Sequence, residues 1–478
     1  MKRKKPELLI PASSLEVLRT AVIFGADAVY IGGEAFGLRA KARNFTMEEM
    51  AEGIAFAHAR GVRVYVTANI LAHNGDLEGA EQYFSELRDM SPQRADALII
   101  SDPGLFAIAR KVWPEVEIHI STQANNTNYE TFLFWWQLGA KRVVSARELS
   151  LAEIGEIRRR IPEEMEIESF VHGAMCVSYS GRCLLSNYFT RRDANKGACT
   201  HPCRWKFAVM EETRPGEYLP VYENERGTFI FNSGDLCMID HIPQLVEAGI
   251  DSFKVEGRMK TALYVAAVAR TYRRAIDDYF ESREKYLRNR DWYRAEIAKC
   301  TYRKFNTGFY FGKPDENAQI YDNSTYVNEY TYLGSIQQVR TGPIPRTPIR
   351  EQRGDMDPAL QDAAGGQQAD LQDAAGEHRA VLALVEQRNK FCVGDRIEIM
   401  KPDGANLEVT VEAMYNGDLQ PVESCPHARE KIWLRRMGRT ETELWYEPVD
   451  FSRTQVLIIE WTHGNSDCYE GIDIPVLL

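Results

Sequence analysis

Short apolar runs alternate with amphipathic segments through the first 258 residues of the chain. The apolar runs are rich in β-branched residues and end in polar ones, which is typical of buried parallel strands. We predict strands at residues 7–12, 27–33, 63–69, 96–102, 117–123, 142–147, 166–173 and 251–258. Between most of them, apolar residues recur every three or four positions, which predicts helices at residues 15–24, 47–60, 78–90, 104–112, 129–138 and 150–159.

This alternation predicts the α/β class, and eight units fit a closed (β/α)8 TIM-like barrel better than an open doubly wound sheet. We assign residues 1–300 to this barrel, with a long helix over residues 263–279 that continues toward residue 298. A cysteine-rich insertion, residues 172–240, interrupts the pattern after the seventh strand. Because long insertions in compact domains are usually functional or disordered, and this one holds apolar and aromatic runs, we expect it to be functional.

The rest of the chain shows shorter strands and turns. Residues 301–340 are predicted to form a connecting β segment, with strands at 303–314 and 325–339 separated by turns. Residues 341–378 are first proline-rich and then repeat LQDAAG, which indicates a linker or mobile loop. The short strands and intervening turn residues of residues 379–450 predict a small β-barrel. Residues 451–478 carry no interpretable motif.

Active sites of parallel barrels form at the carboxyl ends of their strands. The polar residues predicted at or just beyond those ends are Asn69, Gln123, Asn125, Arg147, His172, Glu256 and Arg258. His172 lies at the end of the seventh strand, directly before Gly173, and is a candidate proton shuttle, although a structural histidine is an equal alternative. The amides of Gln123 and Asn125 suit recognition of carbonyls or base edges, but they also suit helix capping.

Five of the nine cysteines lie in the insertion. Cys176, Cys183, Cys199 and Cys203 are separated by six, fifteen and three residues, and a further 33 residues separate Cys203 from Cys237. Thiolates are soft ligands that select zinc or iron–sulfur clusters, and four of them complete either site. Zinc ribbons favour tighter paired spacings, whereas a cysteine nucleophile, with His172 or His201 as its base, would leave four cysteines unexplained.

Composition and charge limit the partners and the compartment. The chain has 69 acidic and 58 basic residues, a net charge of -11, so a nucleic-acid partner would need a local basic patch. The apolar run near the N-terminus is too short for a signal peptide, and no stretch is long enough to cross a bilayer. We therefore expect a cytoplasmic protein with no membrane partner, whose clustered thiols are ligands or catalysts rather than disulfides.

Several longer motifs point to one known family. The stretch ESFVHGAMCVSYSGRCLLS, residues 168–186, resembles the signature of the collagenase-like peptidase family of unknown catalytic type. The resemblance continues through YIGGEAFGLRAKARNF, STQANNTN, NKGACTHPCRW, FNSGDLCMIDHIPQL and SFKVEGRMK, and covers roughly residues 6–315. The chain nevertheless contains no HExxH zinc motif and no GxSxG nucleophile elbow.

Within this family the chain is most similar to the members that hydroxylate tRNA. The resemblance implies formation of 5-hydroxyuridine at the wobble position, dependence on prephenate as a small-molecule co-substrate, and a [4Fe-4S] cluster. It implies Cys176, Cys183, Cys199 and Cys203 as the cluster ligands, with Cys237 as the alternative to Cys203. A protein partner from the same family is also implied.

A dicarboxylate such as prephenate is best held by arginine side chains, whose guanidinium groups can each donate two hydrogen bonds to a carboxylate. Arg39, Arg43, Arg147 and Arg258 lie at or beyond predicted strand ends, with Arg258 the strongest candidate. Glu256 beside it is a candidate base, or a residue that orients the arginine. A surface ion pair is the competing explanation for each arginine.

For RNA contact, the insertion offers cations and one aromatic residue close to the cysteines, where solvated surface charge is the alternative explanation. These residues are Arg191, Arg192, Lys196, Arg204, Trp205 and Lys206. Three alternative functions stay open from the sequence: a collagenase-like peptidase, an rRNA hydroxylase of the same family, and a non-catalytic RNA-binding factor.

Overall fold

The computed structural model divides into two compact units, Met1–Asn328 and Glu329–Leu478, which we describe separately. The residues that it describes are 4–37, 44–176, 178–204, 223–224, 227–228, 234–313, 327–343, 371–372, 378–435 and 456–461.

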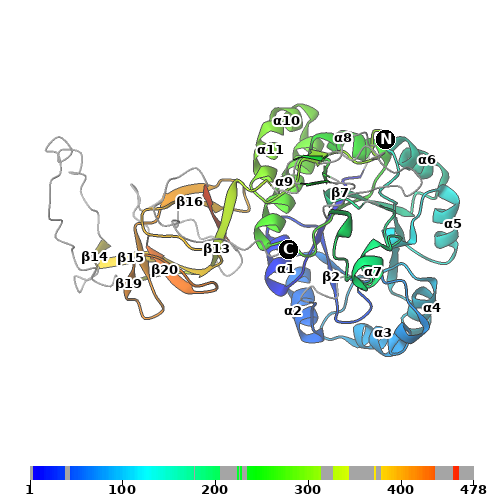
Figure 1. Ribbon diagram of the computed structural model, residues 1–478, viewed down its shortest axis with the longest axis horizontal. Helices are drawn as coiled ribbons and strands as arrows, with labels where there is room; N and C mark the ends of the chain where they lie inside the picture. Colours follow the sequence, from blue (N-terminus) through cyan, green and yellow to red (C-terminus); the bar gives the residue numbers. More distant parts are fainter. Residues whose placement is uncertain are drawn as a thin grey trace. The chain divides into compact units, whose positions relative to one another are not determined.

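The first unit contains a closed barrel of parallel strands surrounded by helices (Figure 1). The barrel strands are β1 (Glu7–Pro11), β2 (Ala28–Gly32), β3 (Arg63–Ala68), β4 (Ala97–Ile100), β5 (Glu117–Ile120), β6 (Arg142–Val144), β7 (Glu166–Ala174) and β11 (Ser252–Val255). Each pairs in parallel with the next, and β11 pairs with both β7 and β1, which closes the ring. The predicted TIM-like fold is confirmed.

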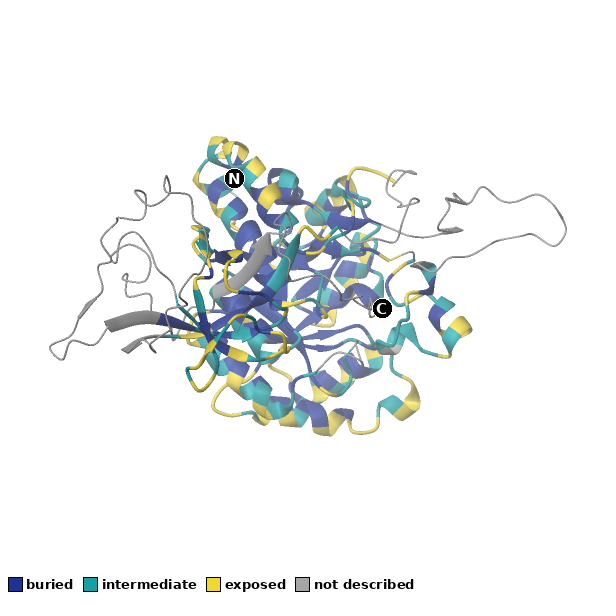
Figure 2. Cartoon of the chain, turned by 60° about the vertical axis from the view of Figure 1, so that its left-hand side comes forward, coloured by how far each residue is buried: buried dark blue, intermediate teal, exposed yellow. Residues whose placement is uncertain are grey.

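In the part of the chain that the structure describes, seven helices outside the insertion lie between the barrel strands. They are α1 (Leu15–Ile23), α2 (Met47–His58), α3 (Ala80–Asp89), α4 (Pro103–Val112), α5 (Tyr129–Gln137), α6 (Leu151–Arg160) and α8 (Ile242–Ala248). All of them except α3 and α8 begin at a residue whose side chain caps the helix. Thr46 and Ser150 each form a reciprocal capping box, with Glu49 and Glu153. Figure 2 shows the buried residues along the strands and on the inner sides of the helices.

Charged residues fill part of the barrel interior. Arg142, 1% exposed, donates to Glu7 at 2.6 Å and to Glu168 at 3.1 Å. Lys254 donates to the other Glu168 oxygen at 2.6 Å. Burial alone would raise the pKa of Glu7, but the cations of Arg142 and Arg63 and their hydrogen bonds lower it to about 2. These buried charges are therefore paired, as buried charges must be.

The insertion begins and ends on neighbouring backbone. Strand β10 (Asp235–Cys237) runs antiparallel to β7, with Asp235 opposite Ala174, so residues 175–234 leave and rejoin the barrel at one edge. Within the insertion lie α7 (Leu185–Thr190), the 3-10 turns η3 (Ala194–Lys196) and η4 (Pro202–Arg204), and the short strands β8 (Glu223–Asn224) and β9 (Gly227–Thr228). In Figure 1, α7 is seen over the opening of the ring of strands.

The chain after β11 differs in two places from the prediction. The expected long helix is interrupted: α9 (Ala262–Glu281) ends at Ser282, whose extended backbone starts α10 (Arg283–Arg288), followed by α11 (Arg290–Ala298). The serine hydroxyl accepts from the Lys285 N–H and so caps a new helix. The strand expected over residues 303–314 is limited to β12 (Phe305–Asn306), because turns follow it.

The second unit is built on a largely antiparallel sheet. Its strands are β13 (Tyr330–Pro343), β14 (Leu371–Gln372), β15 (His378–Gln387), β16 (Arg396–Met400), β17 (Leu407–Thr410), β18 (Ala413–Tyr415), β19 (Pro421–Val422), β20 (Lys431–Arg435) and β21 (Val456–Trp461). The segment without a motif therefore supplies β21, which lies between β13 and β16. Most of the predicted linker, residues 344–370 and 373–377, lies outside the described residues. Among the helices that the structure describes, none has the length and apolar character required of a transmembrane segment.

Candidate active site

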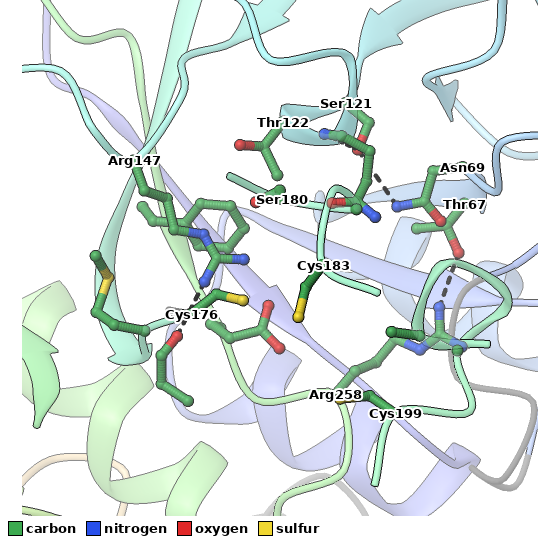
Figure 3. A pocket seen from close by; sticks show the side chains of 18 of the residues that line it. Thr67, Asn69, Ser121, Thr122, Arg147, Cys176, Ser180, Cys183, Cys199 and Arg258 are labelled. Carbon is green, nitrogen blue, oxygen red and sulfur yellow. Dashed lines mark hydrogen bonds between the residues drawn. The ribbon is translucent and has the colours of Figure 1, made fainter. Parts of the chain in front are cut away.

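A cavity of about 200 Å³ lies at the carboxyl ends of the barrel strands (Figure 3). Its walls come from strand ends and from the insertion, whose cysteines Cys176, Cys183, Cys199 and Cys203 all line it. The cavity therefore lies where barrel enzymes hold their substrates.

Arg258 is fixed on one wall of the cavity. Its guanidinium donates to the Thr67 hydroxyl at 2.9 Å and to the Asn44 amide oxygen at 3.0 Å, and the residue is 5% exposed. It lies against Gly32, the last residue of β2: a Cβ added there would come within 2.5 Å of Nη1. The absence of a side chain at Gly32 thus makes room for the arginine.

Two further cations line the cavity, Arg147 and Lys254. Arg147 donates to the Ala174 carbonyl at 3.0 Å and lies over the Phe170 ring, 4.4 Å from its centroid, while its buried Nε has no hydrogen-bond partner. Lys254, bonded to Glu168, has its ammonium 4.5 Å from the Tyr30 ring centroid. Together with Arg258, these residues give the cavity three positive groups.

Glu256 contributes the acidic side chain of this cavity. Its backbone is held at both ends, because its N–H donates to the His172 carbonyl at 2.8 Å and its own carbonyl accepts from the Tyr264 hydroxyl at 2.6 Å. A Cβ at Gly173 would lie 2.5 Å from that carbonyl oxygen. Glycine at position 173 therefore allows β7 and the segment after β11 to approach closely.

The predicted amides fall into two groups. Asn69 and Gln123 line the cavity, and Asn69 donates to Ser121 Oγ at 3.3 Å. Asn125 has a different position: its amide donates to the carbonyls of Gln123 and Ser180, at 2.8 and 3.2 Å. Asn125 thereby ties the turn after β5 to the cysteine-bearing loop, which is a positioning role.

The loop around the cysteines is shaped by left-handed backbone. Gly181 and Gly197 have φ of 73° and 77°, and His201 also lies in this region with φ 53°. The His201 N–H donates to Cys199 Sγ at 3.4 Å. Figure 3 shows the sulfur atoms of Cys176 and Cys183 turned toward the same space.

The donor set fits a thiolate-bound centre in kind and place. Four thiols, the ligands that iron–sulfur clusters and structural zinc use, line one cavity, and a backbone N–H already points at one sulfur. In the part of the chain that the structure describes, no three His, Cys, Asp or Glu side chains converge on a common metal position. Binding would therefore require the thiols to draw together.

Cys237 lies apart from this cavity. It is on β10, with its sulfur 3.9 Å from the Tyr272 hydroxyl, and burial raises the pKa of its thiol to about 12. The structure thus brings Cys203, and not Cys237, into the cavity with the other three cysteines.

His172 does not line the cavity either. Its imidazole is 1% exposed and lies among the rings of Tyr264, Tyr272 and Phe305, with centroids 5.6 to 5.8 Å away. Burial, aided by the charge of Lys260, lowers its pKa to about 3. These surroundings are those of a neutral structural histidine, and they give no support to a proton shuttle at neutral pH.

This burial predicts acid sensitivity. A neutral folded His172 resists protonation, whereas the unfolded residue takes up a proton below about pH 6.5. Its contribution to stability is therefore complete above that pH and is lost as the pH falls toward 3. The loss amounts to about 2 kcal/mol between pH 6.5 and 5. His119, buried in the barrel and with its pKa also lowered by burial and nearby cations, acts in the same direction.

The measurement is the free energy of unfolding from urea titrations at several pH values. His172→Phe keeps a ring among the three aromatic neighbours, so we expect a shallower fall below about pH 6.5 than in the wild type. The exposed His73→Gln is the matched control and should leave the slope unchanged. If the free energy of unfolding of His172→Phe fell with pH as steeply as that of the wild type, a lowered pKa of His172 would be contradicted.

Some of the residues predicted for substrate or RNA binding lie outside the part of the chain that the structure describes. Arg39 and Arg43 are not among the described residues, nor are Trp205 and Lys206, and the side chains of Lys196 and Arg204 are likewise outside. Lys254 was not among the predicted site residues, and Gly32 was predicted only as part of a strand end. The signal for Lys254 was a lone charge inside an apolar strand, SFKV, which is unusual unless that side chain is paired or functional.

Comparison with known proteins agrees with the sequence motifs. Residues 13–320 match the family described as peptidase family U32, and residues 371–444 match the peptidase family U32 C-terminal domain. The tRNA hydroxylation protein P1 of Bacillus subtilis (strain 168) is 38% identical, across 89% of this chain and 90% of its own length. The tRNA hydroxylation protein P of Escherichia coli (strain K12) is 36% identical, across 90% and 93%. A 23S rRNA 5-hydroxycytidine synthase of Escherichia coli (strain K12) is 36% identical across 58% of this chain and 40% of its own length.

Proposed function

Because the chain belongs to peptidase family U32, and relatives named for tRNA hydroxylation are similar over most of its length, we propose that it is a tRNA-modifying hydroxylase. The product is 5-hydroxyuridine at the wobble position, and prephenate is the small-molecule co-substrate. The observation that carries this proposal is a single cavity that combines four cysteine thiols with three cations.

The cations suit a dicarboxylate such as prephenate. Arg147 lies just after β6, Lys254 on β11 and Arg258 just after β11, so two carboxylates could each meet a positive group. Arg258 is already oriented by Thr67 and Asn44, which lowers the entropy cost of binding an anion.

The thiols suit a [4Fe-4S] cluster, with Cys176, Cys183, Cys199 and Cys203 as its ligands. Such a cluster would supply one-electron chemistry next to the anion site. This role explains why a redox-capable donor set lies beside a substrate cavity, which amide hydrolysis does not require. Asn69 and Gln123 offer amide groups for the edge of a uridine base.

Nucleoside analysis of tRNA tests the function directly. A strain lacking this gene should lose 5-hydroxyuridine and its derivatives from digested tRNA, measured by mass spectrometry, and the wild-type gene should restore them. A strain without any second hydroxylase of the same type is required, so that redundancy does not hide the effect. Unchanged modified nucleosides in such a strain would exclude the proposal.

The peptidase alternative is tested on the same purified protein. Hydrolysis of a collagen-derived peptide that survives Cys176→Ala and Cys199→Ala would favour a peptidase that does not use this cavity. Of the two bases considered for a thiol nucleophile, His201 lines the cavity and His172 does not, so this alternative would have to use His201. A protein partner from the same family remains a prediction, for which co-purification is the test.

A further inference from the structure

Helix α7 in the insertion buries a polar side chain and exposes apolar ones, the reverse of the usual arrangement. Ser186 is fully buried, and its hydroxyl lies 3.1 Å from that of Thr200, to whose backbone N–H it is also bonded. Leu184 and Tyr188, one helical turn apart, are instead 74% and 77% exposed. A short amphipathic helix normally buries its apolar side, so among the residues that the structure describes this arrangement is unusual and suggests a binding surface.

The exposed side of α7 combines aromatic rings with cations. We call Leu184, Tyr188 and Phe189, flanked by Arg182 and Arg191, the outer face of α7. The rings of Tyr188 and Phe189 lie 5.2 Å apart at 81°, and Phe189 is 46% exposed. Arg182 and Arg191 are exposed as well.

The charge of this segment is opposite to that of the chain. Five basic residues lie between Cys176 and Arg204, against the single acid Asp193, although the whole chain carries a net charge of -11. The basic residues are Arg182, Arg191, Arg192, Lys196 and Arg204. A partner for this segment is therefore anionic and presents flat apolar surfaces, which describes the unstacked bases and phosphates of single-stranded RNA.

The outer face of α7 is also connected to the cavity. Cys183 lines the cavity, whereas its neighbours Arg182 and Leu184 are exposed, so the chain passes from one side of this segment to the other within three residues. A base taken out of a loop could then enter a site lined by amides and hydroxyls while the neighbouring bases stack outside.

We propose that the outer face of α7 is the platform on which the bases of the tRNA anticodon loop stack next to the target uridine. This inference rests on the proposed tRNA function and names the surface that holds the substrate. It assigns Tyr188 and Phe189 to base stacking, and Arg182 and Arg191 to phosphate contact.

Binding measurements on the full chain test the platform. The probes are an anticodon stem-loop RNA with an unmodified wobble uridine and a fully paired duplex of the same length. We expect Tyr188→Ala/Phe189→Ala to weaken stem-loop binding by about 10- to 100-fold, since stacking on each ring contributes to affinity. Arg182→Gln/Arg191→Gln should weaken it and reduce its salt dependence.

A matched control uses another pair of exposed apolar side chains. Phe134 and Leu138, four residues apart at α5, are 53% and 47% exposed, so Phe134→Ala/Leu138→Ala should bind the stem-loop like the wild type. Equal affinity of the Tyr188→Ala/Phe189→Ala protein would overturn the platform, and so would a loss of binding to anionic vesicles without a loss for RNA. Wild-type protein that binds neither RNA probe would instead count against the proposed tRNA function itself.

Discussion

Replacing Cys183 with alanine should remove the iron and the activity together. The wild-type protein, purified without oxygen, is expected to be brown and to hold about four irons per chain. With one of four thiolate ligands lost, we expect most of the iron to be lost and the formation of 5-hydroxyuridine to fall below detection. The measurements are iron content, absorbance near about 400 nm and nucleoside analysis of tRNA treated with the protein.

The control for this prediction is a buried cysteine outside the cavity. Cys300 is 3% exposed and burial raises the pKa of its thiol to about 12, so Cys300→Ala should keep both iron and activity. A colourless wild-type protein that holds zinc would refute the cluster, although it would leave the tRNA proposal to be tested separately.

The same assay decides the fourth ligand. Cys203 shares the cavity with the other three cysteines, whereas Cys237 lies near the Tyr272 hydroxyl on β10. We therefore expect Cys203→Ala to lose iron and Cys237→Ala to keep it. The reverse result would assign the fourth position to Cys237 and would require the end of β10 to approach the loop.

Loss of the Arg258 charge should have the second largest effect. We expect Arg258→Met to lower kcat/KM for prephenate by about 100-fold, because charge-assisted hydrogen bonds to a carboxylate would be lost. The iron content should be unchanged, which separates this variant from the cysteine variants. Steady-state kinetics at varied prephenate concentration provide the measurement.

Gly32 offers an independent test of the same arginine. A Cβ at this position would lie 2.5 to 2.6 Å from three guanidinium atoms of Arg258, so Gly32→Ala must displace the end of that side chain. We expect about a 10-fold loss of kcat/KM with little change in the free energy of unfolding, since only the tip of a long side chain moves. Gly75→Ala, with no atom within 4 Å of the added Cβ, is the matched control. If Gly32→Ala were fully active, the position of Arg258 would not matter for binding.

Periodicity predicted the barrel well because each unit carries its own signals. The strands are short apolar runs, and caps such as Thr46 and Ser150 mark the helix starts, so local sequence and final structure agree. The break at Ser282 was missed because the helical pattern continues across it, and only the hydroxyl cap ends one helix and begins the next. Strand β21 was missed because its partners, β13 and β16, lie far away in sequence.

The site was predictable in its residue types and less so in its geometry. Strand-end logic placed Asn69, Gln123, Arg147 and Arg258 at the cavity, and all four line it. The same logic also selected His172, because one-dimensional position does not tell which side of a strand end a side chain takes. The prediction placed Gly32 at the end of a strand, but its contact with Arg258, more than 200 residues away, could not be predicted from the sequence.

The antiparallel pairing of β7 with β10 means that the insertion could be removed or exchanged without interrupting the barrel strands. Since Ala174 and Asp235 face each other across one pair of strands, a tight hairpin turn of about two residues could replace everything between them. The eight barrel strands pair with one another without it. The same barrel could therefore carry a different insertion between Ala174 and Asp235, and with it different catalytic groups at the carboxyl ends of unchanged strands.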